Sequence, residues 1–350
     1  MKNGPDVRRL VVRAPNWLGD AVMALPALEA VRRAYEDATI VLAARPAVAP
    51  LFEEDTAARP DEILVVEGQR ETEQLRDAKA DAILLLPNSF GSAWKASRSG
   101  IAERWGYRAD FRGWTLTRAI ARPRGRVHHI DYYLSLVRAL GIETHSTPPE
   151  GASDTAQPEA ATARTPTIAA RPETRAMADA LLARHDVASG APIVGFAPGA
   201  AYGHAKRWPP ERVAAVIAGL AGRGVTAVIV GAGADRDTAR AIESSLPRGV
   251  AAVDLVGLTT LRQLIGVVAR CAAFVSNDSG AMHVAAALGV PLTAIFGPTD
   301  ERVTSPGGNA DVIVRDVFCR PCLLRECPID HRCMKRIDVD TVLKSVRRHL

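Results

Sequence analysis

The sequence has no uninterrupted apolar run approaching about 18 residues, the length from which a helix can cross a bilayer, although 47% of its 350 residues are hydrophobic. It therefore predicts no membrane span. The first 20 residues, MKNGPDVRRLVVRAPNWLGD, also lack the apolar stretch and the small-residue cleavage site of a secretion signal. We expect a cytoplasmic protein.

Several enzyme motifs are missing as well. There is no HExxH motif of zinc proteases and no GxSxG motif of serine hydrolases. The loop FAPGAAYGHAKRWPPERV carries glycines and a lysine, but the Gly-Lys-Ser/Thr of a P-loop is absent. GAGAD, residues 231–235, has only two glycines of the dinucleotide fingerprint. P-loop and protease chemistry are thus disfavoured, and dinucleotide binding has weak support.

Cysteines are few and unevenly placed. Cys271 stands alone and is expected in the core. The other four occur in CRPCLLRECPIDHRC, at Cys319, Cys322, Cys327 and Cys333. Such density indicates a structural zinc site or a pair of disulfides. The spacing matches no established zinc pattern, and a reducing cytoplasm disfavours disulfides, so we interpret the cluster as structural and leave its metal open.

Positive charge is concentrated between Lys95 and Arg126, which include nine basic residues but only two acidic ones, Glu103 and Asp110. This stretch is either a solvated arginine-rich face or a surface for an anionic partner. Nucleic acid, anionic lipid and a phosphorylated glycan would all satisfy it. Charge alone does not choose among them.

Short apolar runs alternate with amphipathic segments in the first part of the chain. RLVVRAP precedes a helical pattern from about residue 20 to 35, and TIVLAARP, DEILVVE and DAILLLPN follow. Continuous apolar runs of this length are typical of buried parallel strands. After Gly141 comes an Ala-, Thr- and Pro-rich segment without apolar periodicity, part of which we interpret as an interdomain linker.

The alternation then restarts with PIVGFAPG, TAVIVGAG, AAVDLVG, AAFVSND, LTAIFGP and DVIVR. Two such series predict an α/β protein with two doubly wound, Rossmann-like parallel-sheet domains and a ligand site in the cleft between them. We expect an N-terminal domain at 1–150, a linker at 151–175, a C-terminal domain at 176–335, and a final helix at 336–350 that packs back on the N-terminal domain.

Asp20 in NWLGDAV follows a glycine at the expected turn from strand to helix. An aspartate at this place is ordinarily a helix N-cap. It could also be a general base, if the rest of the chain builds a site around it. The local sequence does not separate the two.

The stretch AAFVSNDSGAMHVAAALG predicts a strand, a polar turn and a helix. The backbone N–H groups at such a helix start attract phosphate. Ser279 can add a hydroxyl, Gly280 allows close approach, and His283 points back toward the helix start. Each residue alone is better explained as a cap or a core residue. The whole group, with Asp278, favours a phosphate site.

Two further loops could contact a nucleotide. Gly199 and Lys206 lie in the glycine-containing loop after a strand, where one lysine suits a diphosphate, although an exposed lysine is usually only solvated. Asp235 follows another strand and could hold a ribose hydroxyl or cap a helix.

Taken together, five ordered stretches resemble glycosyltransferase family 9, the heptosyltransferases. They are NWLGDAVMALPAL, PGAAYGHAKRWP, DLVGLTTLRQL, SNDSGAMHVAAALGVPLTAIFGPT and CRPCLLRECPIDHRC. The resemblance implies a GT-B fold and inverting transfer of L-glycero-D-manno-heptose from ADP-heptose to heptosyl-Kdo2-lipid A. It implies no cofactor for catalysis.

The resemblance also assigns residues. Asp20 falls at the family's proposed general base, and Lys206 at the lysine that meets the donor phosphates. The donor-binding positions implied are Gly199, Lys206, Asp235, Asp278, Ser279, Gly280, Met282 and His283. An anionic, lipid-linked acceptor would suit the basic stretch, in particular Lys95, Arg98, Arg104, Arg108 and Arg112, and would bring the protein to the inner-membrane surface.

Three other functions stay open from the sequence. A family 9 enzyme with another acceptor would carry the same motifs. A sugar-nucleotide 2-epimerase shares the two-domain architecture but acts without an acceptor. A nucleic-acid-binding protein would use the basic stretch, but the sequence has no such motif and its pI of about 9.1 is only mild support, so we expect no nucleic-acid partner.

Overall fold

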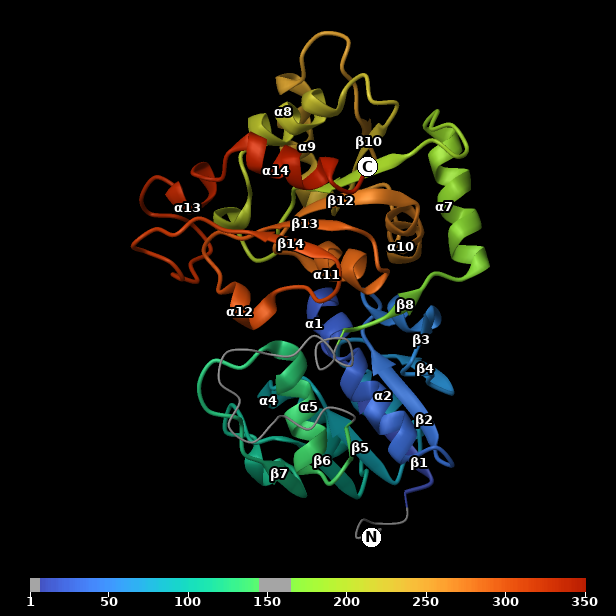
Figure 1. Cartoon of the computed structure of the whole chain (residues 1–350). Helices are drawn as coiled ribbons and strands as arrows, with labels where there is room; N and C mark the ends of the chain where they lie inside the picture. Colours follow the sequence, from blue (N-terminus) through green and yellow to red (C-terminus); the bar gives the residue numbers. More distant parts are fainter. Residues whose placement is uncertain (1–6, 145–164) are drawn as a thin grey trace. The chain divides into compact units, whose positions relative to one another are not determined.

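The computed structural model describes residues 7–144 and 165–350. The chain divides into two compact units, which meet in the sequence between Ile168 and Ala169 (Figure 1). Most of the predicted linker, 151–175, lies outside the described residues. Its last residues, from Pro172, form the first turn of helix α7 (Pro172–Arg184).

Unit 1 is built on a six-stranded sheet of order β4-β2-β1-β5-β6-β7, in which every neighbouring pair is parallel. The strands are β1 (Arg9–Arg13), β2 (Thr39–Ala44), β4 (Glu62–Val65), β5 (Ala82–Leu85), β6 (Glu103–Tyr107) and β7 (Arg118–Ile120). Helices cover both faces of such a sheet, which explains why β5, residues 40–44 of β2 and residues 10–12 of β1 are continuously apolar. β6 and β7 fall in the basic stretch and have no such run, so the sequence did not reveal them.

The helices of unit 1 follow the strands. They are α1 (Leu18–Met23), α2 (Leu25–Ala34), α3 (Glu71–Asp77), α4 (Phe90–Arg98) and α5 (His129–Ala139), with short 3-10 turns η1 (Ala49–Glu53) and η2 (Gly113–Thr115). The single helix expected from about residue 20 to 35 is in fact two helices. The break at Ala24 precedes Pro26, whose ring fits the first turn of a new helix but not a helix interior.

Unit 2 repeats the topology with the order β11-β10-β9-β12-β13-β14, again with parallel neighbours. Its strands are β9 (Ile193–Ala197), β10 (Thr226–Ile229), β11 (Val253–Asp254), β12 (Cys271–Asn277), β13 (Leu292–Ile295) and β14 (Ala310–Ile313). All six coincide with the six runs that the sequence indicated. Two short strands, β3 (Asp55–Thr56) and β8 (Ile168–Ala169), form a separate two-stranded sheet.

The remaining helices of unit 2 connect these strands and end the chain. They are α8 (Pro210–Leu220), α9 (Arg236–Ser245), α10 (Leu261–Ala269), α11 (Gly280–Ala287), α12 (Glu301–Thr304), α13 (Arg332–Lys335) and α14 (Val339–Arg347), with η3 (His204–Lys206) and η4 (Gly233–Asp235). Pro210 begins α8, since the fixed φ of proline suits the first position of a helix. Among residues 7–144 and 165–350, no helix is both long and apolar enough to span a bilayer.

The last helix packs within unit 2, and its predicted packing on the N-terminal domain stays a prediction. In Figure 1, α14 lies beside α8 within unit 2. Val342 and Val346 are buried in the core that α8 and the unit 2 sheet form. Leu343 fits over Gly219 of α8, where a methyl group would come within 2.6 Å of it. The amphipathic face of α14 therefore completes the core of its own unit.

In both units the strand order reverses next to the first strand, β1 in unit 1 and β9 in unit 2. The loops after β1 and β5 leave the carboxyl edge of the first sheet, and those after β9 and β12 leave that of the second. Ligands of doubly wound sheets bind at this switch point. Asp20 follows β1, Lys206 follows β9 and Asp278 follows β12, so the topology puts each at a switch point of its own unit.

Candidate active site

Asp20 occupies the first turn of α1 and is not its N-cap. The N-cap is Trp17, which makes no side-chain capping bond. The carboxylate of Asp20 instead meets the imidazole of His129, with Oδ1 3.0 Å from Nδ1, and both side chains are partly exposed. The capping alternative is therefore wrong, and Asp20 is a reachable carboxylate held in place by a neighbouring ring.

The partner, His129, comes from the first residue of α5, far away in the sequence. α5 packs against α1 and α2. One turn further, Tyr132 accepts a hydrogen bond of 2.8 Å from Asn88, which follows β5. Residues from the loops after β1 and β5 thus meet at the start of α5. Sequence reasoning missed His129, although HHIDYY, a polar pair directly before an apolar helix, offered a signal.

Lys206 and Asp278, both predicted to contact the donor, lie together in unit 2. The Lys206 ammonium donates to Asp278 Oδ2 at 2.6 Å, and both side chains are largely buried. The hydroxyl of Thr299 donates to the same oxygen at 2.7 Å. The lysine also lies 5.0 Å from the ring centre of Tyr202. The Lys206 ammonium is therefore held by a carboxylate and an aromatic ring.

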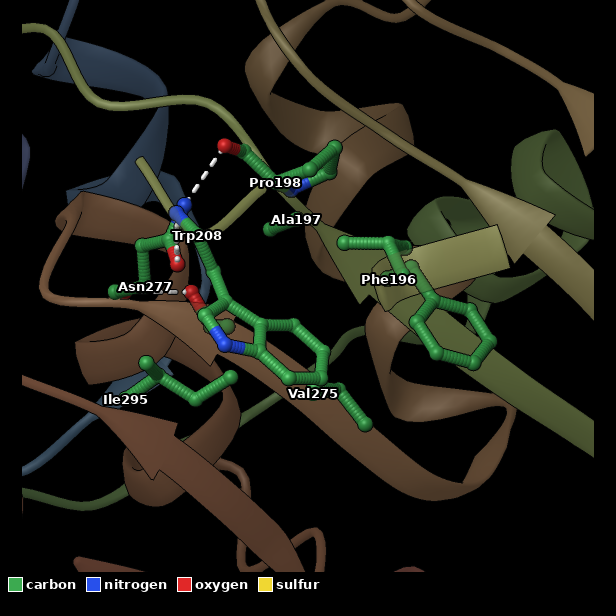
Figure 2. A pocket seen from close by; sticks show the side chains of 9 residues that line it. Phe196, Ala197, Pro198, Trp208, Val275, Asn277 and Ile295 are labelled. Carbon is green, nitrogen blue, oxygen red and sulfur yellow. Dashed lines mark hydrogen bonds between the residues drawn. The ribbon is translucent and has the colours of Figure 1, made fainter. Parts of the chain in front are cut away.

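Asn277 ties together the loops that carry Lys206 and Asp278. Its amide donates to Pro198 O at 2.5 Å and accepts from Trp208 N at 3.3 Å. Figure 2 shows Asn277 between these two residues beside a small cavity that Phe196 and Ile295 help to line. The lining is mostly apolar and offers a diphosphate few partners. The polar groups of this region lie in the loops after the strands.

Gly199 and Asp235 are in contact with each other. A methyl group on Gly199 would lie 2.2 Å from Asp235 Oδ2, so only glycine allows the carboxylate this position. Asp235 Oδ1 pairs with Arg207 at 3.0 Å, and Oδ2 accepts from Ala232 N at 3.1 Å. These contacts give Asp235 a structural role, linking its own turn to the loop of Lys206; its predicted ribose contact stays untested.

The cysteine-rich segment packs against the loop of Lys206. Ala205 N donates to Arg325 O at 2.9 Å, and Ala205 O lies 2.6 Å from His331 Nε2. Gly203 sits so close to Arg325 that a methyl group would come within 2.4 Å of its carbonyl oxygen. This segment therefore has a contact role that the sequence did not indicate: it fixes the backbone of the loop at Gly203 and Ala205.

The predicted order of strand, polar turn and helix is confirmed, with Ser279 as the N-cap of α11 and Gly280 as its first residue. Ser279 Oγ lies 3.1 Å from Ser276 Oγ. His283 is buried in the same helix. Met282 is fully buried in the apolar core beneath the helix, so its side chain belongs to the core, and its donor contact stays a prediction.

The basic stretch does not form one surface. Arg112 is 0% exposed, and it donates to Tyr107 O at 2.9 Å and to Pro87 O. Burial lowers its pKa to about 10. Arg104 donates to carbonyls of its own neighbourhood, among them Thr115 O at 2.8 Å. Lys95 pairs with the buried Glu71 at 2.7 Å.

Of the five predicted acceptor residues, only Arg98 and Arg108 are exposed. The assignment of Arg112 to the acceptor is wrong, because its guanidinium satisfies loop carbonyls inside the unit. Lys95 and Arg104 are partly exposed, with their polar groups engaged within the chain. The exposed positive charge of the stretch continues at Arg122, Arg124 and Arg126.

All five cysteines are free thiols. Cys271 is buried, as predicted, and burial raises its pKa to about 12. Burial, with the neighbouring Cys319, Cys322 and Cys327, also raises the pKa of Cys333. Within the described residues, no three or more His, Cys, Asp or Glu side chains are arranged to hold a metal ion.

The chain matches known proteins over most of its length. A family model described as glycosyltransferase family 9 (heptosyltransferase) matches residues 69–332. Lipopolysaccharide heptosyltransferase 2 of Salmonella typhimurium is 30% identical over 318 residues, covering 88% of each chain. The structure of Escherichia coli ADP-heptose LPS heptosyltransferase II superposes with a TM-score of 0.80 at 27% identity, covering 97% of this chain and 98% of that one.

A second structure, the family 9 glycosyltransferase of Veillonella parvula, gives a TM-score of 0.78 at 22% identity and covers 98% of this chain and 97% of its own. It supports the fold. These likenesses agree with the two Rossmann-like sheets and with the motifs that occupy their switch points.

Proposed function

The chain belongs to glycosyltransferase family 9, the heptosyltransferases, and from this premise we propose the reaction and the residues that perform it. The protein is a glycosyltransferase that moves L-glycero-D-manno-heptose from ADP-heptose to heptosyl-Kdo2-lipid A, in the synthesis of the lipopolysaccharide inner core. The full-length likeness to enzymes named heptosyltransferase 2 or II carries this proposal.

Asp20 is the general base of this reaction. The acceptor hydroxyl attacks the anomeric carbon of the heptose, and the bond from that carbon to the diphosphate oxygen breaks with inversion. Asp20 takes the hydroxyl proton. Two observations support the role: the carboxylate is partly exposed, and His129 3.0 Å away fixes its orientation. A positioned base of this kind contributes about 10²–10⁴-fold to a rate.

Unit 2 binds the donor and receives the negative charge of the departing ADP. Lys206 is the cation at the switch point of this unit, and its pairing with Asp278 keeps the ammonium in one place before the diphosphate arrives. The N-terminus of α11, with Ser279 and Gly280, adds backbone donors. The charge that leaves with ADP is thus met by groups of this chain, and the proposal calls for no cofactor.

The acceptor contacts belong to unit 1. The Kdo carboxylates and the phosphates of the acceptor match the charge of the exposed arginines Arg98 and Arg108. The attraction of these arginines to anionic lipid would hold the enzyme at the cytoplasmic face of the inner membrane. This part of the proposal rests on exposure and charge. It replaces the five-residue assignment, since Arg112 is buried.

The decisive experiment compares wild type with Asp20→Asn on ADP-heptose and purified heptosyl-Kdo2-lipid A, with heptose addition read by mass spectrometry. We expect transfer by the wild type, a loss of about 10³-fold in kcat for the variant, and unchanged binding of ADP. The neutral amide keeps the size of the side chain, so the fold is preserved.

Lys206→Ala is the matched variant in unit 2. It should weaken ADP binding, which Asp20→Asn leaves intact. Full activity of Asp20→Asn would remove Asp20 from the chemistry. Absence of transfer by the wild type, with ADP still bound, would keep the donor site and reject the proposed acceptor.

A further inference from the structure

Three aromatic side chains gather on the surface of unit 1. Phe90 and Trp94 belong to α4, and Trp114 belongs to η2. Their ring centres are 5.9–6.3 Å apart in every pairing. Despite this contact the three side chains remain 41%, 42% and 69% exposed, in the order given. We call Phe90, Trp94 and Trp114 the aromatic patch.

The patch is unusual for this chain. Aromatic residues make up only 5% of the sequence, and two of the five tryptophans lie here. Trp105 and Trp208, by contrast, are among the largest fully buried side chains. Tryptophan exposed beside other aromatic rings costs solvation free energy, and contiguous apolar surface of this kind marks interaction sites.

A fourth exposed aromatic residue, Phe111, comes three residues before Trp114 in the chain. Phe111 is 95% exposed, and both it and Asp110 have left-handed backbone conformations, with φ of 57° and 46°. Non-glycine residues seldom adopt this conformation, and two in succession persist only where the surroundings hold them. The loop is thus built to present Phe111 to the outside.

Buried Arg112 links α4 to the chain that leads to η2, the two elements that carry the aromatic patch. Its Nη1 reaches Ser92 Oγ at 3.3 Å and Ser89 O at 3.4 Å, at the start of α4. Its Nε donates to Tyr107 O at the end of β6, the strand that precedes the loop to Trp114. The arrangement of the rings therefore depends on a fixed internal contact, which a chance gathering of mobile surface side chains would lack.

Positive charge borders the rings. The Arg98 guanidinium lies 6.0 Å from the ring centre of Trp94. Exposed Arg108 lies beside Gly113, since a methyl group on that glycine would be 3.4 Å from Arg108 Cβ. From Arg108 to Thr115 the sequence has one acid, Asp110. Tryptophan and phenylalanine next to arginine match the boundary between acyl chains and anionic headgroups.

The patch also lies on the functional edge of its sheet. Phe90 follows β5 and Trp114 follows β6, while Asp20 follows β1 of the same parallel sheet. Carboxyl ends of parallel strands share one edge. Asn88, two residues before Phe90, bonds Tyr132 in the same turn as His129.

We propose that the aromatic patch, with Phe111, Arg98 and Arg108, docks unit 1 on an anionic phospholipid bilayer. The rings enter the headgroup boundary and the arginines meet lipid phosphates. The purpose of this docking rests on the proposed function, because a lipid-linked acceptor is presented at such a surface. The docking itself requires no acceptor and is testable without one.

The test measures binding of the full chain to vesicles of phosphatidylcholine with and without phosphatidylglycerol. The patch variant is Phe90→Ser/Trp94→Ser/Trp114→Ser. It should bind the anionic vesicles at least about 10-fold more weakly than wild type. The control Phe318→Ser removes a 79% exposed aromatic residue from unit 2 and should bind as wild type does. Arg98→Gln/Arg108→Gln should reduce the preference for phosphatidylglycerol and its salt sensitivity.

A second measurement guards against misfolding of the patch variant. Brominated lipids should quench the tryptophan fluorescence of the bound wild type. The variant Trp94→Phe/Trp114→Phe keeps aromatic rings at both positions, so vesicle binding should persist. Its quenching should fall to that of the three remaining tryptophans, Trp17, Trp105 and Trp208.

Several results would overturn the proposal. The wild type and the patch variant could bind vesicles equally well, or the wild type could show no vesicle binding. Unchanged quenching in the phenylalanine variant would also contradict the proposal. A wild-type dimer that the patch variant converts to monomer would assign the patch to a second copy instead. Transfer to a detergent-dispersed acceptor distinguishes these failures from failure of the proposed function, because it should continue in the patch variant.

Discussion

Asp20 and His129 form a pair that local sequence could only half reveal. The position of Asp20 after a glycine marked it as notable, but its chemical environment depends on a ring 109 residues away in the sequence. That ring limits the carboxylate to one orientation. The pairing turns an ordinary aspartate in a first helical turn into a positioned base for the proposed reaction.

Replacing His129 should separate positioning from binding. In His129→Ala we expect kcat to fall at least about tenfold while the acceptor KM changes little, because the carboxylate loses its orientation in the transition state. His129→Asn offers Nδ2 close to the place of Nδ1 and should recover part of the loss. Steady-state kinetics of the two variants would check this. Equal activity of Ala and Asn would argue against a hydrogen bond as the cause.

Glu71 illustrates a charge kept inside unit 1. Burial by itself would raise its pKa, but Arg13 and Lys95 outweigh burial and the net pKa is lowered. Glu71 Oε1 lies 2.7 Å from Arg13 Nε, and both side chains are almost fully buried. Removing one partner of such a pair leaves a buried charge without compensation.

Glu71→Gln should therefore lower the free energy of unfolding by about 3 kcal/mol near pH 7. Because the folded pKa is depressed, the stabilisation is present above the unfolded pKa of about 4.3 and is lost as pH falls through the folded pKa. Denaturant unfolding of wild type and variant should converge in acid. Lys95→Gln, at the partly exposed side of the same carboxylate, should cost less. A pH-independent difference between Glu71→Gln and wild type would contradict this account.

At the scale of elements, the loop between β9 and α8 is positioned by contacts from three directions. Asn277 holds its two ends, Asp235 fills the space over Gly199, and the cysteine-rich segment fixes Ala205. Lys206 is thus placed by the backbone on both sides. This explains the role of a segment whose cysteines first suggested metal.

Gly203→Ala tests that arrangement. The added methyl group would meet Arg325 backbone at 2.4 Å, so the loop and the cysteine-rich segment must separate. We expect the KM for ADP-heptose to rise several-fold, with the acceptor KM unchanged. Gly233→Ala, where a methyl group meets nothing within 4 Å, is the control. Titration calorimetry with ADP would show whether the loss lies in donor binding; a rise in acceptor KM alone would contradict it.

The basic stretch shows how one pattern can serve opposite purposes. Arg112 satisfies carbonyls inside unit 1, whereas Arg98 and Arg108 reach solvent. An arginine has five N–H donors, which suit a loop with unpaired carbonyls as well as they suit phosphate. Composition does not reveal which of these an arginine meets, because that depends on whether β6, β7 and their loops cover it.

At the scale of the molecule, the two units have the same strand order but separate cores. Each carries part of the proposed chemistry, the base in unit 1 and the donor contacts in unit 2. Ligand binding to one unit should therefore stabilise that unit first.

Hydrogen exchange with and without ADP should show this directly. ADP at 100 times its Kd should stabilise the folded state that binds it by about 2.7 kcal/mol. We expect slower exchange at residues 199–208 and 277–287, and no change in α4 or residues 108–115. Lys206→Ala should reduce the protection. Protection confined to unit 1 would indicate that ADP binds unit 1 and not unit 2, which would contradict the donor assignment.

The sequence alone determined the two α/β units, the six strands of unit 2 and the turn at Ser279, because apolar runs and glycine-bearing turns are set by local backbone geometry and burial. The family followed from the resemblance of its five motifs. The sequence could not determine the partner of Asp20, the burial of Arg112 and Met282, or the packing of α14 on α8. Those depend on which distant segments meet. Contacts between residues more than 100 positions apart, such as His129 with Asp20 and His331 with Ala205, form only when the chain has folded, and the aromatic patch is likewise a product of the tertiary structure.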